Sequence, residues 1–452
     1  MTARDVARRV LDRVDQGGAW ATPTLDGELA RSGLADRDRR LASELVYGVL
    51  RNRSRLDRAL AAHANIVRTP PKLRTALRVA AYQMLFLDRV PAYAAVDDAV
   101  AAARAFGGAK LAGFANAVLR KIATAREPAL PAAGTERLEV EHSLPRWILD
   151  ELAAVAECDE RSAETGEAGG GAPRGIDLAA LAAAFAQPAP LVGRANRLRT
   201  TRDALADELR AAGATTTELA GAMAIRIDDL GDPARSPSFV AGRWTVQDAG
   251  AQRVGELAAP RAGQRILDAC AGVGGKSTHL AELTDDAAQI DAADQSSTKL
   301  GLLAETAARL GIANVRRVAC DLLDPAAPLA SAYDLIVLDA PCTGLGVLRR
   351  HPDAKWRLSP ADVPRLAAIQ AQLLDAVVAR LAPGGTLVYS VCTFTAAETT
   401  AQIASLVQRT GLRLIEQHRT WPPEADAFYI ARLTPSPHLR GQLEKPGGWR
   451  LR

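Results

Sequence analysis

The sequence has few cysteines and no long apolar run, and each absence excludes a class of protein. Its 452 residues include five cysteines, an odd number without a Cys-x-x-Cys pair. This pattern disfavours a disulfide framework and a cysteine-based zinc site, so we expect no metal. No apolar stretch approaches the roughly 18 residues of a membrane span, and charges begin at Arg4, where a signal peptide would be apolar. We therefore expect a cytoplasmic protein that does not enter a membrane.

The length and composition indicate several globular domains. A chain of 452 residues exceeds the size at which one hydrophobic core keeps growing. With 48% hydrophobic and 24% charged residues, the composition is typical of globular proteins and excludes a largely disordered or fibrous chain.

Positive charge is concentrated in the N-terminal third. Residues 1–150 contain 24 Lys or Arg against 17 Asp or Glu, a net of +7, whereas the whole chain has a net of +4. Within it, residues 31–78 carry 12 basic and 4 acidic side chains. This density suits contacts with the phosphates of a nucleic acid, and we take Arg51, Arg53 and Arg55 as candidates. A solvated helix face is the alternative.

The order of apolar residues divides the chain into four parts. Residues 1–150 show helical spacing and no strand-like alternation, which predicts an all-α domain. Residues 157–190 are rich in Gly, Ala and Pro and are expected to be a flexible linker or insertion. Residues 191–243 combine a helix near 202–212 with a strand at 224–227, which predicts a small α+β RNA-binding module whose basic residues start at Arg194.

In residues 244–452, short apolar runs alternate with helical stretches. This α/β pattern is typical of a doubly wound, mainly parallel sheet, in which ligands bind at the carboxyl ends of strands. The expected strands are 265–268, 289–294, 315–319, 333–339 and 386–390.

A glycine-rich loop follows the first of these strands. Residues 267–278 read LDACAGVGGKST, so a strand runs into a glycine loop and then a helix. The spacing excludes a phosphate-binding P-loop, because Cys270 stands where that motif needs Gly. It also excludes the dinucleotide fingerprint, because Ser277 stands at its third Gly. A glycine loop that binds a ligand without binding phosphate groups would suit S-adenosylmethionine, which has an amino acid and a ribose.

Acidic residues end the next two strands. Asp294 lies about twenty residues after the glycine loop, where such folds use an acid to bind ribose hydroxyls, and Asp291 is a competitor for this role. Asp321 follows the third strand, where a carboxylate can accept a hydrogen bond from an adenine amino group. Each acid taken alone could equally be a helix cap.

Two further strand ends carry thiols. Cys342 follows the strand that ends at Asp339, and Cys392 follows the strand at 386–390. A thiolate that adds to carbon 6 of a pyrimidine makes carbon 5 nucleophilic enough to take a methyl group, and an acid near ring nitrogen 3 stabilises the adduct. Two buried cysteines and a capping Asp are the alternative for either segment alone.

These motifs together resemble one family. The loop at 268–276, the DAPC sequence at 339–342, RRHPDAKW at 349–356 and YSVCT at 389–393 are similar to the motifs of the Sun family of RNA cytosine-5 methyltransferases. The bacterial Fmu/Sun type is the most similar. The resemblance covers nearly the whole chain, because residues 1–145 resemble the NusB-like helical RNA-binding domain of these enzymes.

The resemblance implies a Rossmann-like, S-adenosylmethionine-dependent methyltransferase domain. It implies that Cys392 is the nucleophile, that Cys342 assists product release and that Asp339 serves both catalysis and cofactor binding. The other implied cofactor contacts are Cys270, Ala271, Gly272, Val273, Gly274, Gly275, Lys276, Asp294 and Asp321. Arg350, His351 and Lys355 are taken to position the RNA.

The implied substrate is a cytosine of 16S rRNA, free or in a partly assembled small subunit, and we expect a monomer. Where the family has Pro-Glu-Glu-Asn after the nucleophile, this chain has AAET at 396–399 and therefore lacks the Asn that would support Cys392. Two alternatives remain: a DNA cytosine-5 methyltransferase, with Cys342 as nucleophile, and a non-catalytic RNA-binding or assembly factor that keeps the fold.

Overall fold

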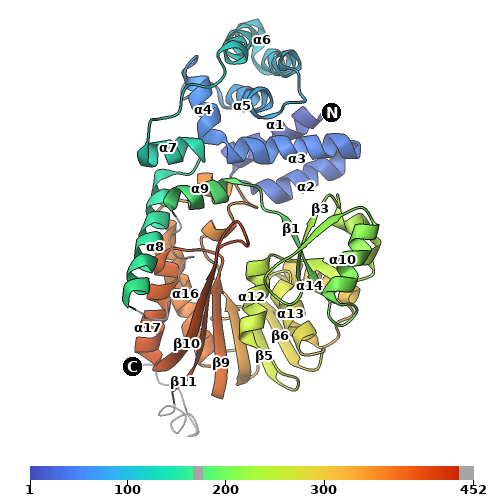
Figure 1. The fold of residues 1–452 in the computed structure, drawn as a ribbon, viewed down its shortest axis with the longest axis vertical. Helices are drawn as coiled ribbons and strands as arrows, with labels where there is room; N and C mark the ends of the chain where they lie inside the picture. Colours follow the sequence, from blue (N-terminus) through green and yellow to red (C-terminus); the bar gives the residue numbers. More distant parts are fainter. Residues whose placement is uncertain (166–176, 437–452) are drawn as a thin grey trace. The chain divides into compact units, whose positions relative to one another are not determined.

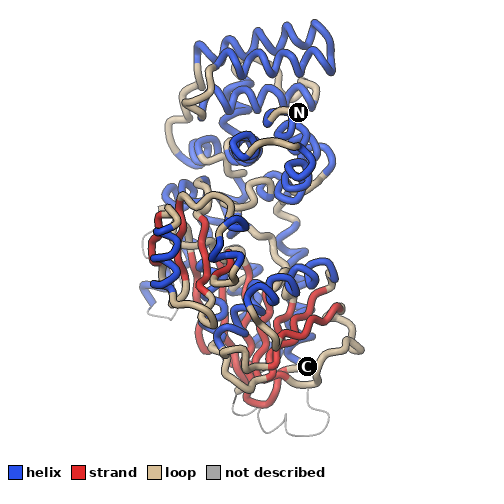
Figure 2. Tube along the Cα trace, turned by 90° about the vertical axis from the view of Figure 1, so that its right-hand side faces the viewer, coloured by secondary structure: helices blue, strands red, loops and turns tan. Residues whose placement is uncertain are grey.

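The computed structural model describes residues 1–165 and 177–436. These residues divide into two compact units. Unit 1 consists of Met1–Glu151, Asp177–Gln187 and Leu348–Leu358, and unit 2 contains the remaining described residues. Within the described ranges every strand lies in unit 2 (Figure 2). None of the described helices combines the length and the apolar character that crossing a membrane requires.

Unit 1 is helical, as the periodicity of residues 1–150 predicts. Thr2 and Asp5 form a capping box at its first helix, and Gly108, with φ of 72°, separates two helical stretches within α6. Leu and Val side chains on the inner helix faces form one core. The helices are α1 (Ala3–Gly17), α2 (Ala21–Ser32), α3 (Asp36–Arg51), α4 (Arg53–Ala61), α5 (Pro71–Phe86), α6 (Ala92–Ala125), α7 (Gly134–Glu141), the start of α8 (Arg146–Thr165) and α9 (Leu178–Ala186) (Figure 1).

A segment from the C-terminal half completes unit 1. Residues 348–358, which include α15 (Ala354–Arg357), belong to this unit although the sequence pattern assigned them to the domain at 244–452. The Asp353 carboxylate accepts a hydrogen bond from the first backbone N–H of α2 at 2.9 Å, and Trp356 Nε1 donates to the Leu50 carbonyl at 2.7 Å. The segment therefore caps one helix and satisfies the end of another.

The predicted linker at 157–190 contains helix on both sides of residues 166–176. Helix α8 continues to Thr165, and α9 packs as part of unit 1. Residues 166–176 lie outside the described residues. The part of this segment that the structure describes is thus folded, because its Ala and Leu residues are good helix formers and Leu181 and Phe185 are buried.

The small α+β module of unit 2 is a four-stranded antiparallel sheet with the order β2-β3-β1-β4. Its core is built around Trp244, which is fully buried. The fourth strand begins at Trp244, so the module extends past the predicted boundary at 243. Its elements are β1 (Leu191–Ala195), α10 (Arg202–Ala211), β2 (Thr215–Glu218), β3 (Ala224–Asp228), α11 (Pro237–Val240) and β4 (Trp244–Val246).

The rest of unit 2 is a seven-stranded sheet with the order β10-β11-β9-β8-β5-β6-β7. The five strands from β9 to β7 are parallel, and β11 and β10 run antiparallel at one edge. The sequence predicts the five parallel strands but not the edge hairpin. The strands are β5 (Arg265–Ala269), β6 (Gln289–Asp294), β7 (Val315–Ala319), β8 (Tyr333–Asp339), β9 (Leu381–Val391), β10 (Leu412–Thr420) and β11 (Phe428–Pro435).

Helices cover both faces of this sheet, which confirms the predicted Rossmann-like arrangement (Figure 1). One core joins the sheet to α12 (Ala249–Ala258), α13 (Gly275–Leu283) and α14 (Ser297–Leu310). A second core on the other face joins it to α16 (Asp362–Val378) and α17 (Thr400–Thr410). Because both faces are covered, polar side chains gather at the strand ends.

Candidate active site

The glycine loop between β5 and α13 has a backbone that ordinary residues rarely adopt. Cys270, Gly272 and Gly274 have φ of 63°, 58° and 82°. A Cβ at Gly274 would lie 2.3 Å from Leu303 Cγ, so only glycine fits there. The loop turns sharply and leaves the first N–H groups of α13 without helical acceptors, which makes a cradle for a ligand.

Asp294, at the end of β6, holds this loop. Its carboxylate accepts hydrogen bonds from Gly272 N at 2.9 Å and Ser296 N at 2.8 Å. The competing Asp291 is engaged elsewhere, because Tyr333 donates to it at 2.6 Å and Arg316 forms an ion pair with it. Of the two acids, the structure therefore brings Asp294 to the glycine loop.

Asp268, the next-to-last residue of β5, is a candidate site residue that the sequence analysis did not select. It is fully buried, and Ser277 donates a hydrogen bond to its Oδ2. Within the described residues its Oδ1 has no hydrogen-bond partner. Burial raises the pKa of Asp268 to about 7. A carboxyl group within an apolar strand is the signal that could have found it, because such a group is rarely buried without a partner.

An ion pair connects the glycine loop to β8. Lys276 Nζ lies 2.6 Å from Asp339 Oδ2, and Ser390 donates to Asp339 Oδ1 at 2.8 Å. Burial lowers the pKa of Lys276, but Asp339 outweighs this effect and leaves the pKa above its ordinary value. Lys276 therefore stays charged at neutral pH.

The two predicted thiols meet at the ends of neighbouring parallel strands. Cys342 Sγ lies 3.4 Å from Cys392 Sγ, and Gly346 N donates to the Cys392 carbonyl at 2.9 Å. The hydrogen bond to Cys392 and burial hold the pKa of Cys342 well above its ordinary value. Cys342 is thus a neutral thiol at physiological pH, close enough to Cys392 for both to act on one ring.

The remaining predicted cofactor contact, Asp321, lies apart from this network. It is exposed, and its Oδ1 accepts from Leu323 N at 2.9 Å in a local turn. Its contact with adenine stays a prediction. Within the described ranges, no three His, Cys, Asp or Glu side chains are grouped so that they could hold a metal ion.

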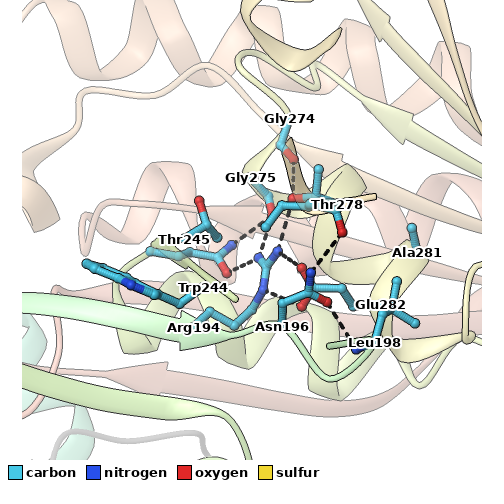
Figure 3. A network of polar contacts seen from close by, with 12 residues as sticks. Arg194, Asn196, Leu198, Trp244, Thr245, Gly274, Gly275, Thr278, Ala281 and Glu282 are labelled. Carbon is cyan, nitrogen blue, oxygen red and sulfur yellow. Dashed lines mark hydrogen bonds and ion pairs between the residues drawn. The ribbon is translucent and has the colours of Figure 1, made fainter. Parts of the chain in front are cut away.

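Arg194 of β1 is not available to RNA, because it is completely buried beneath the glycine loop (Figure 3). Its guanidinium forms a bidentate ion pair with Glu282 of α13, at 2.7 and 3.0 Å. It also donates to the Gly275 carbonyl at 2.9 Å and to Thr278 Oγ1 at 3.0 Å. The sequence-based prediction for this residue is wrong, and the side chain instead fixes the first turns of α13.

We expect Arg194→Met to lower both stability and affinity for S-adenosylmethionine. Breaking a buried pair leaves Glu282 uncompensated and costs about 3–5 kcal/mol. The double variant Arg194→Met/Glu282→Leu should regain stability, because apolar residues can replace a buried ion pair. It should not regain affinity, because Gly275 and Thr278 still lack their donor. Urea unfolding and titration calorimetry check this, and recovery of both quantities would contradict the role in the loop.

The three arginines predicted to bind RNA have partners inside unit 1. Arg53 forms an ion pair with Asp15 at 3.1 Å, and Arg55 donates to Glu127 at 3.0 Å. Arg51 is half-buried and donates to a backbone carbonyl at 3.3 Å. Their contacts with RNA stay a prediction. To contact RNA phosphates, these arginines would have to share their present hydrogen bonds with the phosphates or exchange them.

The three residues of the segment at 348–358 that are predicted to contact RNA differ in their exposure to solvent. His351 is exposed and Arg350 is half-buried. Lys355 is 3% exposed and donates to the Arg51 carbonyl at 3.0 Å, and burial holds its pKa well below the ordinary value. A contact of Lys355 with RNA would require it to leave this enclosed position, so the structure favours His351 and Arg350 as the accessible pair.

Comparison with known families supports both parts of the fold. Residues 256–434 match the family described as 16S rRNA methyltransferase RsmB/F, and residues 1–124 match the NusB family. The NusB-like and methyltransferase folds predicted from the sequence are thereby confirmed.

Related proteins align over nearly the full chain. The probable ribosomal RNA small subunit methyltransferase B of Synechocystis sp. is 35% identical over 431 residues, which cover 94% of this chain and 91% of the relative. The corresponding Bacillus subtilis protein is 32% identical and covers 90% and 88%. The crystal structure of PH0851 has a TM-score of 0.78 at 20% identity, covering 96% of this chain and 99% of that one, which is a likeness of fold.

Proposed function

Because this chain belongs to the RsmB/F family of rRNA methyltransferases, we propose that it methylates carbon 5 of a cytosine in 16S rRNA. The observation that carries the proposal is the 3.4 Å separation of the Cys342 and Cys392 sulfur atoms beside the Asp339–Lys276 pair. A pyrimidine needs a nucleophile at carbon 6 and an acid near nitrogen 3, and this cluster offers both.

The residues of the glycine loop fit S-adenosylmethionine. The buried Oδ1 of Asp268 is an acceptor in need of a donor, and no side chain caps the start of α13 at Gly274 within the described residues. Asp294 holds the loop and is the acid proposed to bind the ribose hydroxyls. When bound, S-adenosylmethionine supplies an electrophilic methyl group. The contacts proposed with it are Asp268, Cys270, Ala271, Gly272, Val273, Gly274, Gly275, Lys276, Asp294, Asp321 and Asp339.

The thiols are given separate roles. The Cys392 thiolate forms a bond to carbon 6, and the electron pair displaced from the ring double bond makes carbon 5 nucleophilic. Asp339 is held by Lys276 and Ser390 where it can stabilise nitrogen 3 of the adduct. After carbon 5 is methylated, a water molecule takes the proton from carbon 5, the electron pair of that bond restores the double bond between carbons 5 and 6, and the Cys392 sulfur departs as thiolate. Cys342, a neutral thiol at 3.4 Å, assists this departure.

The target base must leave its stack to reach these sulfur atoms, since they lie at strand ends within a folded domain. The NusB-family region, with its excess of basic residues, is proposed to hold the surrounding RNA. We propose that the monomer acts on small-subunit RNA, free or partly assembled, which places it in the cytoplasm.

Methylation of rRNA from a deletion strain tests the proposal. Purified protein and S-adenosylmethionine labelled in the methyl group are incubated with small-subunit RNA, partly assembled subunits or DNA of equal sequence, and bisulfite sequencing locates 5-methylcytosine. We expect one modified cytosine in RNA. Modification of DNA alone would favour the DNA methyltransferase, and cofactor binding without methyl transfer to any substrate would favour the non-catalytic factor.

We expect Asp294→Ala to weaken S-adenosylmethionine binding by about 1–3 kcal/mol, the range for losing a hydrogen bond to a charged group. The matched control is Asp291→Ala, three residues earlier on the same strand, whose carboxylate serves Arg316 and Tyr333. Titration calorimetry should show near-normal affinity for the control. Equal losses in the two variants would show that the effect comes from β6 as a whole rather than from a cofactor contact.

A further inference from the structure

Glu398 is a buried carboxylate that the sequence analysis did not select. It ends a short 3-10 helix at Ala396–Glu398, after the loop that carries Cys392, and it is completely buried. The residues that donate to it come from three separate segments of unit 2. A buried carboxylate needs such donors, because burying a charge without them is strongly unfavourable.

Two of these segments carry the thiols. Thr343, the residue after Cys342, donates its backbone N–H to Glu398 Oε1 at 2.8 Å and its hydroxyl to Oε2 at 2.6 Å. Thr393, the residue after Cys392, places its hydroxyl 3.2 Å from the same Oε2 and 2.8 Å from the Thr343 hydroxyl. One carboxylate therefore binds both residues that directly follow the two thiols.

The third segment fixes Glu398 itself. Gln370 of α16 donates to Glu398 Oε1 at 3.1 Å and to the Pro341 carbonyl at 3.0 Å. Tyr389 of β9 donates to the Glu398 carbonyl at 2.8 Å. Its hydroxyl also lies 3.1 Å from Gln370 Oε1. Gln370 therefore ties the carboxylate to α16, and Tyr389 ties the backbone of Glu398 to β9.

We propose that Glu398 is a positioning residue that holds Cys342 and Cys392 at the separation that the reaction requires. The inference rests on the proposed function and adds to it a residue that touches neither RNA nor cofactor. Glu398 stands at the second Glu position of the family pattern whose Asn is Thr399 here.

Glu398 also acts electrostatically on Cys342. It is among the groups that raise the pKa of Cys342, after the hydrogen bond to Cys392 and burial.

Because a misplacement of about 1 Å can lower a rate by about 100-fold, loss of the carboxylate should affect catalysis far more than cofactor binding.

The first test separates turnover from binding. In Glu398→Ala we expect kcat to fall by about 100-fold, while the Kd of S-adenosylmethionine stays within about twofold of the wild type. Glu398→Gln keeps one oxygen acceptor and should recover part of kcat. Thr343→Val, which deletes one donor, should lower kcat, whereas Thr410→Val, which removes a buried hydroxyl of α17 that bonds the Leu406 carbonyl, should not.

The second test measures the thiol geometry without RNA. The oxidant diamide converts the paired thiols to a disulfide at a rate that depends on their separation and mobility. Mass spectrometry of the Cys342–Cys392 peptide pair should show a rate in Glu398→Ala and Thr343→Val that differs at least about tenfold from the wild type, and a normal rate in Thr410→Val.

The outcomes distinguish this inference from the proposed function. Wild-type kcat and cross-linking in both Glu398→Ala and Thr343→Val would overturn the positioning role, even if the enzyme methylates cytosine as proposed. If the wild type has no cytosine methylation activity but its cross-linking rate depends on Glu398, the proposed function fails and the positioning role stands. If Glu398→Ala does not fold, Glu398→Gln and Thr343→Val decide.

Discussion

Replacing Cys392 with Ala should lower methyl transfer by at least about 10⁴-fold, on the scale of losing an essential nucleophile. Without the sulfur atom nothing adds to carbon 6, and carbon 5 stays too weak a nucleophile to be methylated. Affinity for S-adenosylmethionine should be unchanged, because the glycine loop is held by Asp294, Arg194 and the Lys276–Asp339 pair rather than by this thiol. A filter-binding assay of methyl incorporation and calorimetry of the cofactor measure the two quantities.

Cys342→Ala is the matched control, because it removes a thiol only 3.4 Å away. This variant should attack and methylate once, then stall with Cys392 still bonded to carbon 6. A denaturing gel should show a retarded protein–RNA band for Cys342→Ala and none for Cys392→Ala. The reverse pattern would make Cys342 the nucleophile, as in the DNA-type mechanism, and full activity of both variants would end the covalent proposal.

Asp339→Asn should lower kcat by about 10²- to 10⁴-fold, the usual range for an acid–base group. The amide cannot supply the charge or proton that the carboxyl group offers near nitrogen 3, and it leaves Lys276, whose side chain is 11% exposed, without its counter-ion. Single-turnover methylation at saturating S-adenosylmethionine measures the chemical step.

A double variant separates the two consequences of losing Asp339. Asp339→Asn/Lys276→Met removes both charges, so its free energy of unfolding should return toward the wild-type value. Turnover should stay low, because nitrogen 3 still lacks its acid. If turnover returned with stability, Asp339 would be only a counter-ion for Lys276.

The sequence predicted the central sheet well because parallel strands are buried on both faces. The runs at 289–294, 315–319 and 333–339 match β6, β7 and β8 at both ends. The edge strand β10 was missed, since it carries Arg, Glu and His side chains and lacks a long apolar run. The segment at 348–358 was assigned to the wrong unit, because sequence order does not reveal which core a loop joins.

The site residues predicted from the sequence are those whose chemistry follows from their own residue type and their position in the sequence. Thiols, glycines and acids at strand ends can be read from residue type and position, and Cys342, Cys392 and Asp294 were predicted in this way. Arg194 and Glu398 act through bonds that span 88 and 55 residues of sequence. Residue type alone does not reveal these bonds, and charge alone assigned Arg194 to RNA, since a basic residue is more often exposed than buried.

The place of residues 348–358 within unit 1 has a consequence for how the protein is made. The ribosome releases residues 1–151 first, and Leu348 follows about 200 residues later. At about 5–20 residues per second, this interval lasts roughly 10–40 s. During this interval the Leu50 and Arg51 carbonyls cannot accept their hydrogen bonds from Trp356 and Lys355, because those residues have not been synthesised. For the same reason Asp353 does not yet cap α2. The helical domain that is synthesised first therefore finishes folding only after β8 and the Cys342 loop have left the ribosome.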